Sequence, residues 1–394
     1  MSGLSKQRLT RMTDHLRRTT ESGEVPGIVA MVARRDDVHV DVTGVQDLET
    51  RGPMKRDMIF QIASMTKPVT AVAAMMLVEE GRLRLDEPVD RLLPELANRK
   101  VLRSVKSPLD DTVPAERPLT LRDLLTMRSG HGMTMAPPGT YPIQNLVSDL
   151  QIGPGPMGPP FEPDEMMKRF AQVPLMFQPG QRWQYHTSFD ILGVLIARAA
   201  GMRLEDFLAE RIFAPLGMKD TGFTVPKEKL PRLAGSYVFQ GKFERFDEFN
   251  GQSVRAKMYP AGSTGLVSTI DDYLAFGRMM ARLGKHGTTR LLSRPTVEAM
   301  ITDQLQPENK SPESFFPGFW DNQGWGFGVS VITRRDGPSA NPGRFGWTGG
   351  LGTIWMSDPR EDMVMIFLGQ RGYDETVVQL HNDFLTLAYQ AIDD

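Results

Sequence analysis

The chain contains no cysteine among its 394 residues. Without thiols it cannot form disulfides, use a cysteine nucleophile or hold a metal through thiolates. Its six histidines show none of the spacings typical of a zinc site, such as HExxH. We therefore expect no metal and no other cofactor.

Long apolar runs are also missing. No stretch reaches the roughly 18 apolar residues that a membrane-spanning helix needs. Residues 1–23 are polar throughout and lack the apolar core of a secretory signal. These absences predict a cytoplasmic protein with no membrane partner.

An excess of charge of one sign is lacking too, because 46 Lys and Arg residues face 48 Asp and Glu residues, for a net charge of −2. The chain therefore lacks the excess of positive charge that is typical of a nucleic-acid-binding protein. A hydrophobic content of 40% is typical of a globular protein. We expect a small-molecule substrate, and the sequence leaves open whether the protein is a monomer or a homodimer.

The β-like segments lie near the two ends of the chain. After an amphipathic helix at the N-terminus, residues 27–35 and 38–45 read as a hairpin around a short acidic turn, and 58–64 as a third extended segment. Residues 324–335, 343–350, 351–359 and 362–370 read as further strands, and a final helix follows. This order predicts an α/β (α+β) fold with one antiparallel sheet, flanked by helices and built from both ends of the chain.

The middle of the chain reads as an inserted, mostly helical domain. We place the sheet domain at 1–80 plus 262–394 and the inserted domain at 81–261. Within the latter, residues 130–162 are rich in proline and glycine ("APPGTYP", "IGPGPMGPPFEP"). An insertion of that length either forms a lid or pocket wall, or is a surface excursion without function.

The first chemical candidate is "SMTK" at residues 64–67, where an extended segment gives way to a helix. Ser64 and Lys67 stand one helical turn apart on the same face. A serine at a helix N-terminus lies where the helix dipole favours developing negative charge. A lysine held there out of water would have a depressed pKa and could act as a base. Four letters alone also match by coincidence, so the motif needs partners elsewhere.

Two distant segments supply such partners. Tyr185, in "WQYHTSFDILG", lies just before an amphipathic helix, and a tyrosine near a lysine can relay the proton of a nucleophile. The alternative is an ordinary packed tyrosine, and the neighbouring His186 is expected at the surface. "FGWTGGLGTIW" at 345–355 places glycines on a strand, which often marks the close approach of a ligand. No GxSxG is present, which disfavours the nucleophile elbow of α/β-hydrolases.

Together these motifs resemble the serine β-lactamase/penicillin-binding-protein superfamily, in its class C-like branch. The similarity extends over most of the chain, through segments such as "FQIASMTKPVTAVAAMMLVEEG", "FQPGQRWQYHTSFDILG" and "AGSTGLVSTIDDYLAFG". Within that branch the chain looks most like the β-lactamase-like (family VIII) carboxylesterases. The resemblance implies a β-lactamase/DD-peptidase-like fold.

The resemblance also implies roles for individual residues. Ser64 would be the acylated nucleophile, Lys67 its base partner, and Tyr185 the tyrosine of the family's YxN motif. The backbone N–H groups of Ser64 and Gly350 would bind the oxyanion. The candidate substrate-binding residues that it implies are Trp347, Thr348 and Gly349, at the position of the family's KTG motif, and Thr187, at that of the YxN asparagine. The sequence itself adds Arg344, close to Trp347, His131 in "SGHGM", and Met133, an adaptable apolar side chain in the proline- and glycine-rich insertion.

Two departures from the family pattern bear on the substrate. Trp347 replaces the lysine of KTG, so a cation that helps to bind a β-lactam or peptide carboxylate is missing, unless Arg344 substitutes for it. Thr187 replaces the asparagine of YxN, so a side-chain amide that grips a substrate amide is also missing. In the carboxylesterase branch, tryptophan or histidine replaces that lysine.

We therefore expect a serine hydrolase that cleaves carboxylic esters with short acyl chains through a Ser64 acyl-enzyme. The alternatives within the fold are a β-lactamase, a D-amino-acid peptidase and an acyltransferase. A more remote alternative is a binding pseudoenzyme without turnover. The sequence does not say whether Lys67 or Tyr185 is the base in each step.

Overall fold

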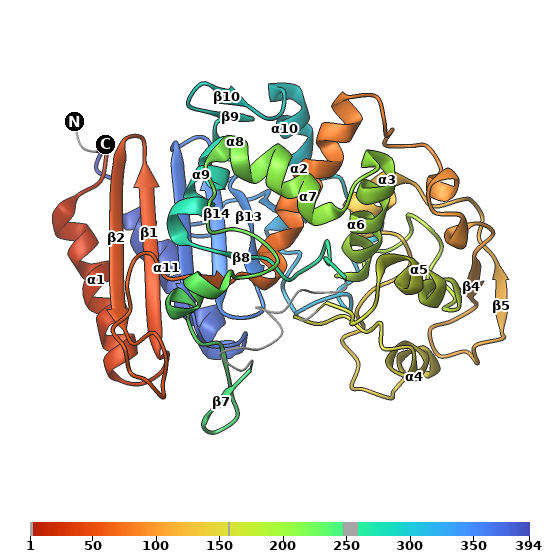
Figure 1. Ribbon diagram of the computed structural model, residues 1–394, viewed down its shortest axis with the longest axis horizontal. Helices are drawn as coiled ribbons and strands as arrows, with labels where there is room; N and C mark the ends of the chain where they lie inside the picture. The colour runs from red at the N-terminus through yellow and green to blue at the C-terminus, as the bar shows by residue number, and fades with distance from the viewer. Residues whose placement is uncertain (1–2, 157, 247–258) are drawn as a thin grey trace.

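The computed structural model describes residues 3–156, 158–246 and 259–394. Its centre is a seven-stranded sheet in the order β11-β12-β13-β14-β15-β1-β2, with every neighbouring pair antiparallel (Figure 1). The strands are β1 (Gly27–Arg34), β2 (Asp37–Gly44), β11 (Gln323–Trp325), β12 (Ser330–Ile332), β13 (Phe345–Gly349), β14 (Thr353–Asp358) and β15 (Met363–Gly369). The predicted sheet from both chain ends is confirmed.

The position of each strand in the sheet accounts for its pattern of apolar and polar residues. Every residue of β1 and of β15 is buried, which fits their nearly continuous apolar runs, whereas β2 at the edge alternates with more exposed residues. The segment 324–335 differs from the prediction of one strand. It forms two short strands, β11 and β12, because Gly328 at φ +82° turns the chain back between them.

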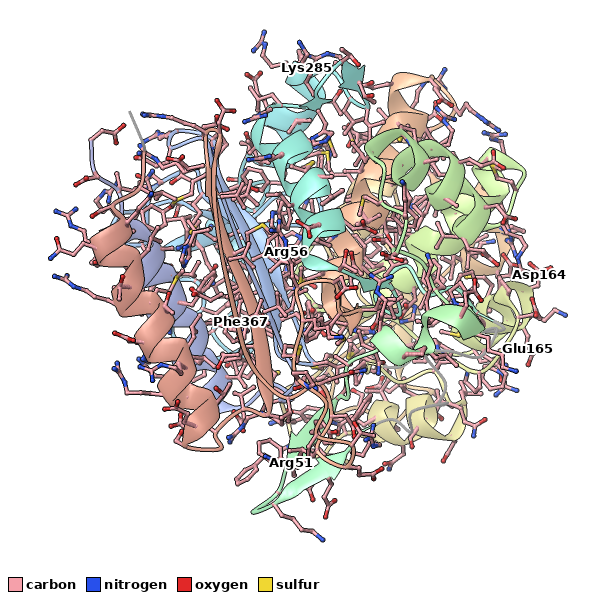
Figure 2. The ribbon with its side chains drawn as sticks, turned by 60° about the vertical axis from the view of Figure 1, so that its left-hand side comes forward. Arg51, Arg56, Asp164, Glu165, Lys285 and Phe367 are labelled. Atoms are coloured by element: carbon pink, nitrogen blue, oxygen red, sulfur yellow. The ribbon has the colours of Figure 1, made fainter. Side chains whose placement is uncertain are left out.

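Helices cover both faces of the sheet. On one face, α1 (Lys6–Glu21) packs beside α11 (Glu375–Gln390), and Figure 2 shows Phe367 of β15 on this side, where its ring meets Phe384 at 5.6 Å. On the other face lie α9 (Ile270–Ala281), packed on β14 and β15, and α2 (Thr66–Glu79). Helix α2 in turn packs against α6 (Thr187–Ala200), so it joins the sheet to the middle of the chain.

The middle of the chain contains shorter elements. Its helices are α3 (Leu121–Leu125), α4 (Pro142–Asp149), α5 (Pro163–Ala171), α6, α7 (Leu204–Leu208), a π-helical turn (Ala209–Phe213) and α8 (Ala214–Leu216). Two hairpins, β4 (Lys100–Leu102) with β5 (Thr112–Pro114) and β6 (Tyr237–Phe239) with β7 (Phe243–Arg245), lie among long loops. The domain boundaries at 81 and 261 stay predictions. Residue 157 of the insertion and residues 247–258 of the inserted domain lie outside the described ranges.

The remaining elements are small. They are β3 (Phe60–Gln61), paired with β8 (Val267–Ser268), β9 (Lys285–His286), paired with β10 (Thr289–Arg290), and α10 (Arg294–Met300). The 3-10 helices are η1 (Ala63–Met65), η2 (Val89–Arg91), η3 (Pro94–Leu96), η5 (Lys227–Arg232) and η6 (Pro307–Asn309). The predicted extended segment 58–64 is thus shorter than expected, because the chain already turns at Ala63.

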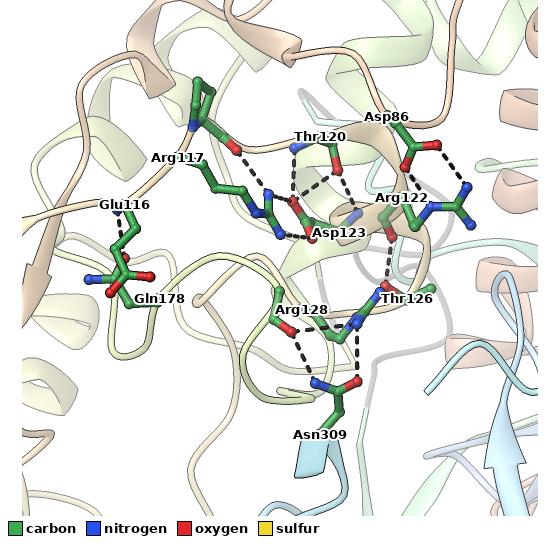
Figure 3. A network of polar contacts seen from close by, with 12 residues as sticks. Asp86, Glu116, Arg117, Thr120, Arg122, Asp123, Thr126, Arg128, Gln178 and Asn309 are labelled. Carbon is green, nitrogen blue, oxygen red and sulfur yellow. Dashed lines mark hydrogen bonds and ion pairs between the residues drawn. The ribbon is translucent and has the colours of Figure 1, made fainter. Parts of the chain in front are cut away.

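Asn309 is the centre of a polar network that holds the loop before Tyr185, and Figure 3 shows its contact with Arg128. Arg128 donates to the side-chain oxygen of Asn309 at 3.0 Å, and the amide of Asn309 donates to the carbonyl oxygens of Gly180 and Gln181. The backbone N–H of Trp183 donates to the carbonyl of Asn309 at 3.1 Å. Three separate segments are therefore tied together two residues before Tyr185.

None of the helices in the described ranges is both long enough and apolar enough to span a bilayer.

Candidate active site

Ser64 lies in the turn η1, between the end of β3 and the start of α2. The preceding Ala63 adopts φ +43°, a left-handed conformation that costs a non-glycine residue on the order of 1 kcal/mol. The hydroxyl of Thr66 donates to the carbonyl of Ala63 at 2.7 Å and holds this turn. The strained turn places the Ser64 side chain at the entrance of the helix.

Lys67 meets Ser64 one turn further along. Its Nζ donates to Ser64 Oγ at 2.9 Å and to the carbonyl oxygen of Ser263 at 2.8 Å. The side chain is fully buried, and this burial lowers the pKa of Lys67 to about 7, although the negative charge of Asp190 opposes the shift. A substantial fraction of this lysine is therefore a neutral amine near neutral pH.

Tyr185 completes the group. Its phenol is hydrogen-bonded to the Ser64 side chain, and its oxygen accepts a hydrogen bond from Trp347 Nε1 at 2.8 Å. Lys67 Nζ lies 4.6 Å from the centre of the tyrosine ring. Burial raises the pKa of Tyr185 well above its usual value, so the phenol keeps its proton at neutral pH. The structure thus brings together the three side chains named from the sequence.

Strand β13 runs close behind this group. A Cβ placed on Gly349 would come within 2.4 Å of the carbonyl oxygen of Ile62, two residues before Ser64, so only glycine allows the approach. The next residue, Gly350, borders open space, since a Cβ there would meet nothing within 4 Å. This geometry is compatible with the predicted role of the Gly350 N–H, which stays a prediction.

Trp347 stands in a crowded aromatic environment. Its ring centre lies 4.7 Å from that of Trp325 and 5.5 Å from that of Tyr185, and its side chain is buried. The position of the family's lysine is therefore filled by a largely apolar ring, whose single side-chain donor, the indole N–H, is hydrogen-bonded to Tyr185.

Three predicted substrate-binding residues line one cavity of about 340 Å³, namely His131, Met133 and Thr187. Most of its remaining wall comes from residues 130–162, including Ile143, Val147 and Ile152. The backbone N–H of Met133 donates to the carbonyl of Tyr185 at 2.8 Å, which joins this wall to the loop that carries Tyr185. The proline- and glycine-rich insertion thus forms a pocket wall, one of the two alternatives that the sequence left open.

Arg344 is not brought to Ser64. Its guanidinium donates to the carbonyl of Ser339 and is buried near Asp358, at the opposite end of β13 from Gly349. The structure therefore does not support the alternative that Arg344 replaces the missing lysine. Thr348 lies one residue beyond Trp347 on β13 and is hydrogen-bonded to the phenol of Tyr373.

The sequence interpretation missed a buried polar group beneath Lys67. Ser263 Oγ donates to Asp190 Oδ1 at 2.5 Å and lies 2.9 Å from His186 Nε2. All three side chains are buried, so the expected surface position of His186 is wrong. Burial raises the pKa of Asp190 and lowers that of His186 well below its usual value. A carboxylate inside the apolar face of "TSFDILGVLI" was the signal that could have revealed this group.

Within the described ranges, no group of three or more His, Asp or Glu side chains is arranged to hold a metal ion.

Comparison with known proteins agrees with this geometry. The model of the Beta-lactamase family matches residues 12–390. A protein of Mycobacterium tuberculosis, Rv1367c, is 37% identical over 369 residues, which cover 92% of this chain and 90% of that protein. Esterase EstB of Burkholderia gladioli is 30% identical over 373 residues, covering 88% of this chain and 86% of EstB.

A solved structure shows the same fold. It is that of EstCE1, described as a hydrolase with promiscuous acyltransferase activity, with a TM-score of 0.80 at 23% identity over 97% of this chain and 99% of that one. The chain belongs to the beta-lactamase family and is a serine hydrolase of that fold.

Proposed function

We propose that this protein is a carboxylesterase that works through an acyl-enzyme on Ser64. The observation that carries the proposal is the 2.9 Å contact between Ser64 Oγ and a buried Lys67 amine whose pKa is lowered to about 7. A nucleophile with a base at this distance is what acyl transfer requires. The esterase activity named for EstB, at 30% identity, supports the choice of substrate class.

In the acylation step, the neutral amine of Lys67 accepts the proton of Ser64 while Oγ attacks the ester carbonyl. The raised pKa of Tyr185 makes a phenolate base unfavourable, so the phenol acts as a relay between the lysine and the leaving oxygen. The phenol gives its proton to the leaving alcohol and regains one from the Lys67 ammonium. The backbone N–H groups of Ser64 and Gly350 stabilise the oxyanion.

In the deacylation step, a water molecule replaces the alcohol. The Lys67 and Tyr185 pair takes a proton from this water, and the resulting hydroxide attacks the acyl carbon. The tetrahedral intermediate collapses, the bond to Ser64 Oγ breaks, and Oγ regains a proton from the same pair. The products are the free acid and the resting enzyme.

Two substitutions favour plain esters over β-lactams and peptides. Trp347 offers no cation for a substrate carboxylate, and its N–H is already bonded to Tyr185. Thr187, on the wall of the cavity, lacks the amide that would hold a substrate amide. We place the acyl chain in this cavity, because Thr187 lines it two residues after Tyr185 and because Met133 of its wall is hydrogen-bonded to the Tyr185 carbonyl. We propose p-nitrophenyl acetate and butyrate as good substrates.

The test combines labelling with turnover. Wild-type protein and Ser64→Ala are treated with a fluorophosphonate, and the adduct is located by mass spectrometry. Hydrolysis of p-nitrophenyl butyrate and of nitrocefin is then measured for both proteins. We expect a Ser64 adduct, rapid ester turnover and little nitrocefin hydrolysis. An adduct without turnover would indicate a pseudoenzyme, and full activity in Ser64→Ala would refute the mechanism.

An acyltransferase is the second candidate, since the description of EstCE1 includes acyl transfer. In that reaction an alcohol or amine would replace water in the second step. Adding a primary alcohol to the p-nitrophenyl butyrate assay separates the two activities. A carboxylesterase gives mainly butyrate, whereas an acyltransferase gives mainly the new ester.

A further inference from the structure

Two large aromatic rings lie exposed side by side near the active site. Phe316, in the loop before β11, is 43% exposed, and Tyr373, between β15 and α11, is 37% exposed. Their ring centres are 6.1 Å apart, with planes inclined at 30°. Grouped apolar surface of this kind often marks a binding site.

Tyr373 is hydrogen-bonded to β13 and to the residue that follows this strand. Its backbone N–H donates to the carbonyl oxygen of Gly350 at 3.0 Å. Its phenol is hydrogen-bonded to the side chain of Thr348. These two anchors hold the ring beside the residue that we assign to the oxyanion.

Phe315 connects this exposed pair with the reacting groups. Its ring centre lies 4.4 Å from that of Phe316, 5.0 Å from that of Tyr185 and 6.3 Å from that of Trp347. A continuous aromatic row therefore runs from Tyr185 through Phe315 and Phe316 to Tyr373. We call these last three residues, Phe315, Phe316 and Tyr373, the aromatic rim.

We propose that the aromatic rim binds an aromatic ring in the alcohol part of the ester, so that arylmethyl esters are preferred over saturated esters of the same size. This inference rests on the proposed esterase function. Stacked or edge-on rings attract each other beyond the burial of apolar area, whereas a cyclohexyl group gains only the burial.

The position of the rim assigns it to the alcohol rather than the acyl chain. The Tyr185 phenol delivers the proton to the leaving oxygen, and Phe315 packs against the ring of Tyr185. None of the three rim residues is among those that line the 340 Å³ cavity, where we place the acyl chain. The two parts of an ester would thus occupy separate surfaces on either side of the reacting carbonyl.

The test compares kcat/KM for benzyl acetate and cyclohexylmethyl acetate, which share the acyl group and release alcohols of similar acidity. The wild-type protein is expected to prefer the benzyl ester roughly two- to tenfold, the range that an aromatic pair supplies. Phe316→Leu should bring the ratio close to one. The matched control is Phe239→Leu, because Phe239 is also exposed, at 41%, but contacts Phe243 and Arg371 outside the rim.

A second pair of substrates tests the assignment to the alcohol. Ethyl phenylacetate and ethyl cyclohexylacetate carry the same rings on the acyl side. A preference that appears only with this pair would overturn the alcohol assignment. A wild-type ratio near one with benzyl acetate, or an unchanged ratio in Phe316→Leu, would overturn the role of the rim.

Binding of the product alcohols separates failure of this inference from failure of the esterase proposal. Benzyl alcohol and cyclohexylmethanol are titrated against the intrinsic fluorescence of the protein, since Trp347 lies beside Phe315. If no ester is turned over, tighter binding of benzyl alcohol that is lost in Phe316→Leu would still support the rim. Equal binding of the two alcohols would refute it.

Discussion

The indole N–H of Trp347 donates a 2.8 Å hydrogen bond to the phenolic oxygen of Tyr185. Trp347 therefore takes the place of the lysine of the family's KTG motif and, at the same time, orients Tyr185, the tyrosine of the YxN motif. Because the donor points at the phenol oxygen, the phenolic hydrogen is left free to point towards Ser64, Lys67 or the leaving group.

Trp347→Phe tests this orientation. The variant keeps an aromatic ring in the cluster but loses the donor, together with part of the buried indole volume. Losing one hydrogen bond of about 0.5–1.5 kcal/mol should lower kcat roughly two- to tenfold. Steady-state kinetics with p-nitrophenyl butyrate measure this, and an unchanged kcat would show that the bond does not orient Tyr185.

The pH dependence of activity follows from the lowered pKa of Lys67, at about 7. Below that pH the amine is protonated and cannot accept the proton of Ser64, so kcat/KM should fall about tenfold per pH unit. Above it the rate should level off. A pH profile of kcat/KM between 5 and 9 checks this, with correction for spontaneous ester hydrolysis; a flat profile through 7 would count against Lys67 as the base.

Asp190→Asn should shift the pH below which kcat/KM falls. The negative charge of Asp190 raises the pKa of Lys67 against the effect of burial. Removing the charge should therefore shift the acidic limb of the kcat/KM profile to lower pH. Asp190→Glu restores the charge and should return the limb towards its original position. A loss of activity without a shifted profile would indicate a purely structural role for Asp190.

Gly349→Ala tests the close approach of β13 to the nucleophile turn. The added methyl group would come within 2.4 Å of the Ile62 carbonyl oxygen, so the strand or the turn must shift. A misplaced oxyanion donor costs about 10²–10³ in kcat. Gly337→Ala, in the loop before β13, is the control, because a Cβ there also meets nothing within 4 Å and the residue lies outside the site; it should stay within a few-fold of wild type. Equal activities in the two variants would contradict this account.

Val147→Phe tests the cavity as the acyl site. The larger ring would fill part of the roughly 340 Å³ that Val147 lines. We expect kcat/KM to fall more for p-nitrophenyl butyrate and octanoate than for the acetate, which serves as the internal control. Parallel losses for all three esters would place the acyl chain elsewhere. The wild-type series also measures the proposed preference for short chains.

The catalytic triplet could be predicted because each of its motifs is a short local segment and the motifs together resemble those of the superfamily. Ser64 and Lys67 share one helical turn, and Tyr185 precedes a helix within a motif that keeps its spacing. The sheet was predictable for the same reason, since β1 and β15 are short apolar runs bounded by turns.

The group around Asp190 could not be predicted in the same way. His186 stands only one helical turn before Asp190, but Ser263 reaches the carboxylate only because α6 packs against the segment after 259. Arg344 failed for a geometric reason that the sequence does contain: it stands three residues before Trp347, and residues at odd separations along extended chain face opposite sides. Two of the three residues of the aromatic rim, Phe315 and Phe316, lie in "SFFPGFW", a stretch whose importance appears only once Tyr373 packs beside it.

Because β15 lies between β14 and β1, the central sheet cannot be completed until the C-terminal strands have been synthesised. The N-terminal hairpin is made first, yet its partner strand is made more than 300 residues later, as the register of Ile28 with Gly369 requires. Gly349, which packs behind the turn of Ser64, lies on β13 and is also made near the end of the chain. A nascent or truncated chain would therefore carry the nucleophile and its base without the strand that leads to the oxyanion donor, and hydrolytic activity would begin only when synthesis is nearly finished.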